Sequence, residues 1–198
     1  MYVISGVTGH TGSAAAEALL SQGKKVRVLV RDEAKGAPGR ARGAEPFVAN
    51  YEDSAALSAA FRDAEGVYVL VPPGGWSNPD EADVRARVRT AILTAVGAAR
   101  PKHVVALSSI GAQHAEGTGP IKALHTLEQG LRALKVPSSF VRAGFFMENW
   151  APMVQGALAS GQLYYPLAAD WKFPRSRRRT SARRWRRCSS TRPRRARG

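Results

Sequence analysis

The chain has 198 residues, 44% of them hydrophobic, and a formal net charge of +15 at pH 7. This length suits one α/β domain with a buried core, and no apolar run approaches the roughly 20 residues of a membrane helix. The N-terminus runs directly into a strand-like pattern without a signal-peptide pattern, which favours a cytoplasmic protein. The single cysteine, Cys188, excludes an internal disulfide framework and a cysteine-based metal site, and we expect no metal.

The positive charge is concentrated at one end of the chain. Residues 1–172 contain all fifteen acidic residues and eighteen basic ones, which leaves +3, whereas residues 173–198 contain twelve arginines. Such a cluster would bind polyanions with strong salt dependence. Base readout needs an ordered scaffold, so we expect no specific nucleic-acid partner.

Strand-like and helix-like patterns alternate along the chain. Strands are predicted at Tyr2–Ser5, Lys25–Val30, Glu45–Asn50, Val67–Val71, His103–Ser109 and Ser138–Arg142. Helices are predicted at Ser13–Gln22, from Asp53 or Ser54 to Phe61, at Asp80–Ala99 and at Ile121–Leu134. This alternation predicts an α/β fold, a doubly wound parallel sheet of the Rossmann type, over residues 1–172.

Residues 173–198 form a basic low-complexity tail. From Pro174 onward there is no Leu, Ile, Val, Met, Phe or Tyr, so nothing there can build a core and we expect disorder. The residue types that remain are those that a GC-rich gene encodes when it is read out of frame. We therefore hypothesise that the reading frame shifts near Phe173 and that the natural C-terminal part is lost, which the downstream nucleotide sequence would test.

A glycine motif, Gly6-x-x-Gly9-x-x-Gly12, lies between the first strand and the first helix. Glycines in this position permit a tight turn, a close backbone approach to a pyrophosphate and close packing of the helix on the strand. The N-terminus of the following helix favours an anion. The motif in this context predicts dinucleotide binding.

Arg31 and Asp32 follow the second strand. An acidic residue here would hold the ribose 2′-hydroxyl of NAD, whereas an arginine accommodates the 2′-phosphate of NADP. Arg31 comes first, at the strand end, where its guanidinium could stack on adenine and pair with the phosphate. The sequence therefore favours NADP(H) over NAD(H), and the alternative is that both residues are solvated charges.

Other candidates lie at carboxyl ends of strands, where ligands bind in open α/β sheets. Asp53 could accept a hydrogen bond from the adenine amino group, or it could be the N-cap of the next helix. The loop 72–75, which begins at Pro72, could run beside the nicotinamide ribose, and Ser108 lies near the end of the fifth strand. Beyond the sixth strand, Phe145 and Phe146 could be core residues or the wall of a substrate pocket.

Together these residues resemble the NmrA-like branch of the atypical short-chain dehydrogenases, which includes NAD(P)H:quinone oxidoreductase-like enzymes. The matching segments are 3–12, 30–32, 69–73, 107–111, 124–128 and 141–149. The resemblance implies NADP(H) contacts at Gly6, Thr8, Gly9, His10, Thr11, Gly12 and Arg31, and a substrate cleft near Phe145, Phe146 and Asn149. Members continue into a smaller domain that closes over the substrate, and the Arg-rich tail stands in its place here.

The sequence departs from ordinary short-chain dehydrogenases, which use a Tyr-x-x-x-Lys pair for proton transfer. No such pair occurs in this chain. Lys122 and His125, on the helix after the fifth strand, are the nearest catalytic candidates, His125 because it could titrate near neutral pH. The alternative is that His125 is a helix residue at the cleft edge, and Glu128 could orient it or face solvent.

Two classes of function follow. The first is an NAD(P)H-dependent oxidoreductase that reduces a quinone or a similar carbonyl acceptor, with the cofactor supplying the hydride. The alternative is a non-catalytic NAD(P) sensor that regulates a partner, or a remnant that is inactive without a C-terminal substrate domain. The expected partners are the dinucleotide and a small-molecule acceptor, with no membrane, and the sequence leaves a homodimer open.

Overall fold

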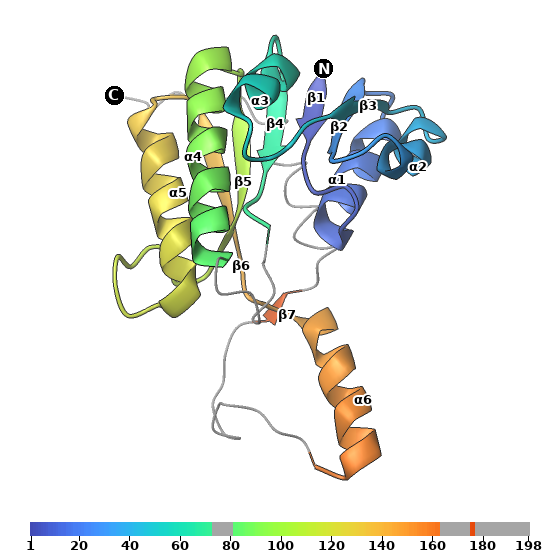
Figure 1. The fold of residues 1–198 in the computed structure, drawn as a ribbon, viewed down its shortest axis with the longest axis vertical. Helices are drawn as coiled ribbons and strands as arrows, with labels where there is room; N and C mark the ends of the chain where they lie inside the picture. The colour runs from blue at the N-terminus through green and yellow to red at the C-terminus, as the bar shows by residue number, and fades with distance from the viewer. Residues whose placement is uncertain (73–80, 163–174, 177–198) are drawn as a thin grey trace, which may run out of the picture.

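The computed structural model describes residues 1–72, 81–162 and 175–176 (Figure 1). Six parallel strands form the main sheet in the order β3-β2-β1-β4-β5-β6. They are β1 (Tyr2–Ile4), β2 (Val26–Val30), β3 (Glu45–Val48), β4 (Gly66–Val69), β5 (Val104–Ser109) and β6 (Ser138–Ala143). This order confirms the predicted doubly wound Rossmann-type sheet.

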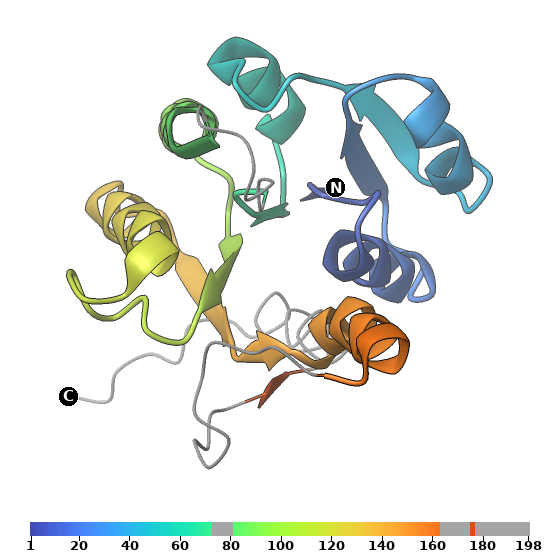
Figure 2. The same ribbon diagram turned by 60° about the horizontal axis from the view of Figure 1, so that its bottom comes forward.

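Helices cover both faces of the sheet (Figure 2). On one face lie α3 (Ser54–Phe61), α4 (Glu81–Ala99) and α5 (Lys122–Ala133), and on the other lies α1 (His10–Leu20). The short η1 (Ala34–Gly36) and α2 (Ala37–Arg40) pack beside β2 and β3, and η2 (Gly119–Ile121) leads into α5. The chain winds outward from β1 to β3 and then from β4 to β6, so a crevice opens between β1 and β4 at the carboxyl edge.

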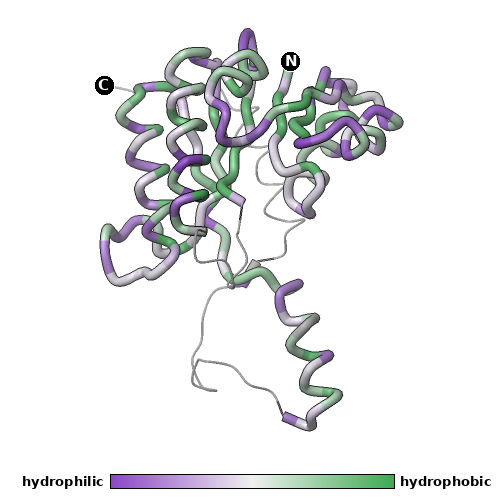
Figure 3. The backbone as a smooth tube through the Cα atoms, viewed as in Figure 1, coloured by the Kyte–Doolittle hydropathy of each residue, from purple (hydrophilic) through white to green (hydrophobic). Residues whose placement is uncertain are grey.

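The sheet is buried between two apolar layers, and the hydropathy colouring alternates between polar and apolar residues along the helices (Figure 3). Leu57, Phe61 and Leu131 are fully buried on the α3–α5 face, and Ile4 and Leu19 are buried on the α1 face. Each such side chain contributes about 1.5–3 kcal/mol of burial free energy. The two layers hold the carboxyl ends of the strands, and therefore the crevice, in fixed positions.

Several element boundaries differ from the sequence prediction. α1 begins at His10 rather than at Ser13, because Gly9 is its N-cap and the first turn is built from the glycine motif itself. η1 and α2 were not predicted, because the segment 34–40 is too short and too rich in small residues for a helical periodicity to show.

After β6 the chain forms β7 (Phe145–Phe146), η3 (Met147–Asn149) and α6 (Trp150–Ser160), and β8 (Arg175–Ser176) pairs in parallel with β7. Within the tail predicted from the sequence, the structure describes only Arg175 and Ser176, whose pairing with β7 is made by the backbone. The rest of the predicted tail, the boundary at residue 172 and most of the loop 72–75 lie outside the described residues.

α6 extends away from the sheet and its helices (Figure 1). It ends at Gly161, which takes the left-handed conformation, with φ of 71°. Among the described residues, Leu158 is the most exposed large apolar side chain, at 76%. No helix within the described ranges is long and apolar enough to cross a membrane.

Candidate functional site

A cavity of about 810 Å³ occupies the carboxyl edge of the sheet. Its wall runs from the glycine motif and the end of β2, past the ends of β4 and β5, to the segment after β6. Eleven of the residues singled out from the sequence contribute to it: Gly6, Thr8, Gly9, His10, Thr11, Arg31, Pro72, Ser108, Phe145, Phe146 and Asn149. Gly12, Asp53, Lys122 and His125 lie outside this wall as far as the structure describes it.

Each of the three glycines of the motif meets a different steric requirement. Gly6 has a positive φ of 67°, and a Cβ there would lie 2.6 Å from Leu70 Cδ2. A Cβ on Gly12 would lie 2.3 Å from the Gly6 carbonyl oxygen, so Gly12 serves helix packing rather than the cavity wall. A Cβ on Gly9 would meet only the Gly6 carbonyl oxygen, at 3.4 Å. The fold therefore tolerates a side chain at Gly9. Because Gly9 lines the cavity, such a side chain would project into the space that a ligand needs.

The N-terminus of α1 opens on this wall. Gly9 is the N-cap, and no side chain caps the first turn. The backbone N–H groups of a helix's first turn lack partners within the helix, and the helix dipole makes this end positive. The glycine motif and α1 together could therefore hold a pyrophosphate.

Tyr51 is a cavity residue that the sequence analysis did not select. Its hydroxyl accepts a hydrogen bond from the Gly6 N–H at 2.8 Å and donates to the Leu29 carbonyl at 3.3 Å. Burial raises the pKa of Tyr51, outweighing the opposing hydrogen bond from Gly6 and the charge of Arg31, so the phenol stays protonated. The signal that could have found it is its place just after the third strand.

The end of the cavity at β2 is cationic. Arg31 and Lys35 both line it, and Lys35 is brought there by η1. Asp32 turns to Lys35: its Oδ2 lies 2.8 Å from Lys35 Nζ, and its Oδ1 accepts from the Lys35 backbone N–H at 2.9 Å. These hydrogen bonds from Lys35, helped by its charge and that of Arg31, lower the pKa of Asp32. Asp32 lies outside the described cavity wall, and its carboxylate is paired with Lys35.

The described wall contains no aspartate or glutamate. Its basic side chains are His10, Arg31, Lys35 and Arg85, the last of which comes from α4. An enclosed site lined by one sign of charge attracts ligands of the opposite sign. The cavity therefore suits a molecule with several phosphates.

Asp53 is the N-cap of α3. Its Oδ1 accepts hydrogen bonds from the backbone N–H groups of Ala55 at 2.9 Å and Ala56 at 3.0 Å. This confirms the capping alternative for Asp53. The structure does not bring its side chain to the cavity wall.

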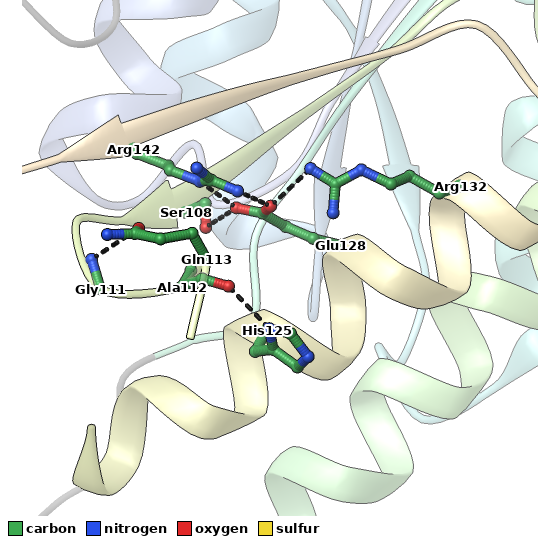
Figure 4. A network of polar contacts seen from close by, with 8 residues as sticks. All are labelled: Ser108, Gly111, Ala112, Gln113, His125, Glu128, Arg132 and Arg142. Atoms are coloured by element: carbon green, nitrogen blue, oxygen red, sulfur yellow. Dashed lines mark hydrogen bonds and ion pairs between the residues drawn. The ribbon is translucent and has the colours of Figure 1, made fainter. Parts of the chain in front are cut away.

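A polar cluster around the buried carboxylate of Glu128 joins α5 to β5 and β6 (Figure 4). Ser108 Oγ donates to Glu128 Oε1 at 2.6 Å. Arg142 binds both carboxylate oxygens, Nε to Oε1 at 2.9 Å and Nη2 to Oε2 at 2.5 Å, and Arg132 Nη2 donates to Oε2 at 3.0 Å. Ser108 and Arg142 are partners in the β5–β6 register, and Glu128 reaches them from α5.

Glu128 has 0% exposure, which excludes the solvent-facing alternative, and its carboxylate bonds to Ser108, Arg132 and Arg142 rather than to His125. A buried charge persists only when it is paired and hydrogen-bonded, and here two arginines supply the pairing. Burial raises the pKa of Glu128, but the hydrogen bonds from Arg142 and Ser108 and the charges of both arginines outweigh it. The net pKa therefore lies below its usual value.

The two catalytic candidates point elsewhere. His125 Nδ1 lies 2.9 Å from the Ala112 carbonyl oxygen, which makes Nδ1 the protonated nitrogen (Figure 4). Lys122, at the start of α5, is exposed. Neither side chain belongs to the described cavity wall, whereas Ser108 does.

An aromatic wall closes the β6 end of the cavity. Phe145 and Phe146 are half-buried, lie outside both core clusters and line the cavity together with Asn149. The Phe145 ring meets the Trp150 ring edge-on, with centroids 5.9 Å apart. Ile110, Ile121 and Leu124 also line this end, beside the hydroxyls of Ser108 and Ser109, so it suits a flat, largely apolar molecule.

Two known reductases are similar in sequence. The NAD(P)H azoreductase of Xenophilus azovorans is 30% identical over 167 residues, which cover 84% of this chain and 56% of that protein. The (4-alkanoyl-5-oxo-2,5-dihydrofuran-3-yl)methyl phosphate reductase of Streptomyces griseus is 30% identical over 168 residues, which cover 83% and 55%. The chain thus spans just over half the length of these relatives.

Solved structures share the fold. The NADPH-dependent quinone oxidoreductase of Escherichia coli, complexed with NADPH, has a TM-score of 0.78 at 24% identity, covering 92% of this chain and 62% of that chain. The Citrobacter sp. triphenylmethane reductase complexed with NADP(H) has a TM-score of 0.68 at 18% identity, covering 80% and 55%. The sequence itself matches the NmrA-like family over residues 2–176. Since this match extends over most of the sequence, the chain belongs to the NmrA-like family.

Proposed function

We propose that this chain binds NADP(H) in the cavity at the carboxyl edge of its sheet and reduces a quinone or a similar carbonyl acceptor. The observation that carries the proposal is the continuity of one cavity from a cationic end at Arg31 and Lys35, past the α1 N-terminus, to an apolar aromatic end. The proposal is supported by the similarity to an NAD(P)H azoreductase and to two reductases whose structures contain NADPH or NADP(H).

The preference for NADP(H) rests on the β2 end. A 2′-phosphate needs cations and the absence of an opposing carboxylate, and a guanidinium matches phosphate geometry particularly well. Arg31 and Lys35 are both in the wall, and Asp32 is engaged with Lys35. NADH would offer no phosphate to Arg31.

The bound nicotinamide would supply the hydride, so the chain's own residues bind, orient and exclude water. In our proposal the glycine motif and α1 hold the pyrophosphate, and Phe145 and Phe146 hold the flat acceptor against the cofactor. Reduction of a quinone needs little acid catalysis, which suits a wall without a Tyr-x-x-x-Lys pair.

The test is a comparison of NADPH and NADH binding by fluorescence titration, followed by NADPH oxidation with a panel of quinones. Arg31→Ala should weaken NADPH about 10- to 100-fold, the strength of a charge-assisted phosphate contact, and leave NADH unchanged. Arg40→Ala, an exposed arginine outside the cavity wall, is the matched control. Tighter binding of NADH than of NADPH by the unaltered chain would contradict the proposed preference.

A second candidate is a non-catalytic NADP(H) sensor. It is favoured by the position of Lys122 and His125 outside the described wall, which leaves the cavity without either proposed proton donor. Tight NADPH binding without oxidation by any quinone would favour the sensor. Turnover with a quinone would exclude it.

A further inference from the structure

The Ser108–Glu128 hydrogen bond has a fixed direction. The Glu128 carboxylate accepts four hydrogen bonds. Oε1 accepts from Ser108 and Arg142, and Oε2 accepts from Arg142 and Arg132. Two arginine guanidinium groups within 3.0 Å hold the carboxylate in its charged form, which has no proton to give. The serine hydroxyl must therefore be the donor.

A hydroxyl has one proton and two lone pairs. The Ser108 hydroxyl donates its proton to the buried Glu128 carboxylate, and Ser108 also lines the cavity. Only its lone pairs are left to face a ligand. Ser108 can accept a hydrogen bond from a bound molecule, but it cannot donate one to a carbonyl oxygen.

The position of Ser108 shows which part of a dinucleotide it would meet. It is the penultimate residue of β5, which lies two strands beyond β1 on the side away from β2 and Arg31. With the 2′-phosphate at Arg31 and the pyrophosphate at α1, the nicotinamide half extends toward β5. That half carries hydrogen-bond donors on its carboxamide amino group and on its ribose hydroxyls.

We propose that Glu128 is a positioning residue that fixes Ser108 as a hydrogen-bond acceptor for a donor group on the nicotinamide half of the dinucleotide. The inference rests on the proposed function, since it needs the dinucleotide in this cavity. It assigns Ser108 to cofactor orientation rather than to proton delivery. The buried cluster below it then serves the site as well as the fold.

The experiment measures dissociation constants of three ligands: NADP⁺, its 3-acetylpyridine analogue, which lacks the carboxamide N–H groups, and adenosine 2′,5′-bisphosphate, which lacks the whole nicotinamide half. Ser108→Ala should weaken NADP⁺ about three- to tenfold, the worth of one hydrogen bond, and leave the bisphosphate unchanged. An unchanged affinity of the analogue would identify the carboxamide as the donor, and an equal loss would identify the ribose hydroxyls. Thr126→Ala, on the exposed side of α5, is the control.

Glu128→Gln tests the positioning role. Its amide nitrogen can donate to Ser108 and turn the serine proton toward the cavity, so NADP⁺ should lose the same factor as in Ser108→Ala. Ser108→Thr keeps the hydroxyl and should restore NADP⁺ binding. The ratio of wild-type to Ser108→Ala affinities should stay constant from about pH 5.5 to about pH 8, because Glu128 remains ionised there.

Two results would overturn the inference: unchanged NADP⁺ affinity in Ser108→Ala, or an equal loss for the bisphosphate, which would mean a structural effect. Folded Glu128→Gln with wild-type NADP⁺ affinity would remove Glu128 from the proposal. If Glu128→Gln does not fold, the Ser108→Ala ligand series decides alone. Failure of the unaltered chain to bind NADP⁺ at all would instead reject the proposed function, and this inference with it.

Discussion

The two ends of the cavity are built in different ways. At the β1–β2 end the wall consists of backbone in the glycine motif and of cations at a strand end, Arg31 and Lys35. At the β5–β6 end it consists of side chains, Ser108 and the aromatic pair, above a buried ion cluster. The first end depends on local chain geometry, and the second depends on β5, β6 and α5 meeting correctly.

Because of this difference, substitutions at the two ends should act in different ways. A change in the glycine motif acts on the backbone directly, because a Cβ at Gly12 has no room. A substitution in the ion cluster leaves a charged group without its partner. Glu128 is buried, whereas Arg132 and Arg142 are partly exposed.

The largest effect is expected at Gly12. Gly12→Ala would place a Cβ within 2.5 Å of three backbone atoms of Ser5 and Gly6, so we expect a loss of about 3 kcal/mol or more in the free energy of unfolding. Gly9→Ala should keep the stability but lose NADPH binding, because Gly9 has φ of −102° and space within the fold. Urea unfolding and NADPH titration separate the two. Equal stability losses in both variants would contradict the contrast.

The next effect is expected at Glu128. Glu128→Ala leaves Arg142 without its bidentate partner, and we expect a loss of about 2–3 kcal/mol of stability, less than for a fully buried pair because both arginines reach solvent. Arg132→Ala removes a half-exposed contact with Glu128 and the stacking of the guanidinium over the Phe140 ring, 4.6 Å from its centroid, and should cost about 1 kcal/mol. Denaturant midpoints of the two variants measure the difference. A cost for Arg132→Ala as large as that for Glu128→Ala would show that the cluster's strength lies elsewhere.

A smaller effect is expected at Tyr51. Tyr51→Phe leaves the Gly6 N–H without its 2.8 Å partner, so we expect about 1 kcal/mol less stability and a few-fold weaker NADPH binding. Thermal unfolding and NADPH titration measure both. Unchanged values would mean that water replaces the hydroxyl.

The smallest effect is a dependence of stability on acid pH. The folded-state pKa of Glu128 lies below its ordinary value of 4.5, so its stabilising contribution is full above that value and is lost as pH falls through the folded pKa. The difference in unfolding free energy between wild type and Glu128→Gln should therefore shrink only below about pH 4.5. A difference that shrinks as pH rises would have the wrong sign.

Local sequence signals predicted much of the fold and the β1–β2 end of the site. Glycine spacing depends on backbone sterics within a few residues, so Gly6 and Gly9 were found in the cavity wall. Arg31 was found because it directly follows a strand, whereas Lys35 was missed because η1 was not predicted.

The ion cluster was missed because its members are far apart in sequence. Glu128 nevertheless carries a readable signal: it lies four residues after Leu124 and three before Leu131, within the apolar stripe of α5. A charged residue inside such a stripe needs a buried partner. Arg142, in a strand, is the partner, but the β5–β6 register that brings it to Ser108 follows only from the folded sheet.

The reversal of strand order between β1 and β4 separates the two ends of the cavity into different halves of the chain. Arg31 and Lys35 lie in the first sixty residues, and Ser108, Phe145 and Asn149 lie beyond residue 100. Arg31 follows β2 and Ser108 lies in β5, and these strands are not neighbours in the sheet, so the effects of substitutions at the two residues on ligand affinity should add. A fold of this kind can change its aromatic wall at Phe145 and Phe146 while the glycine motif and Arg31 stay the same.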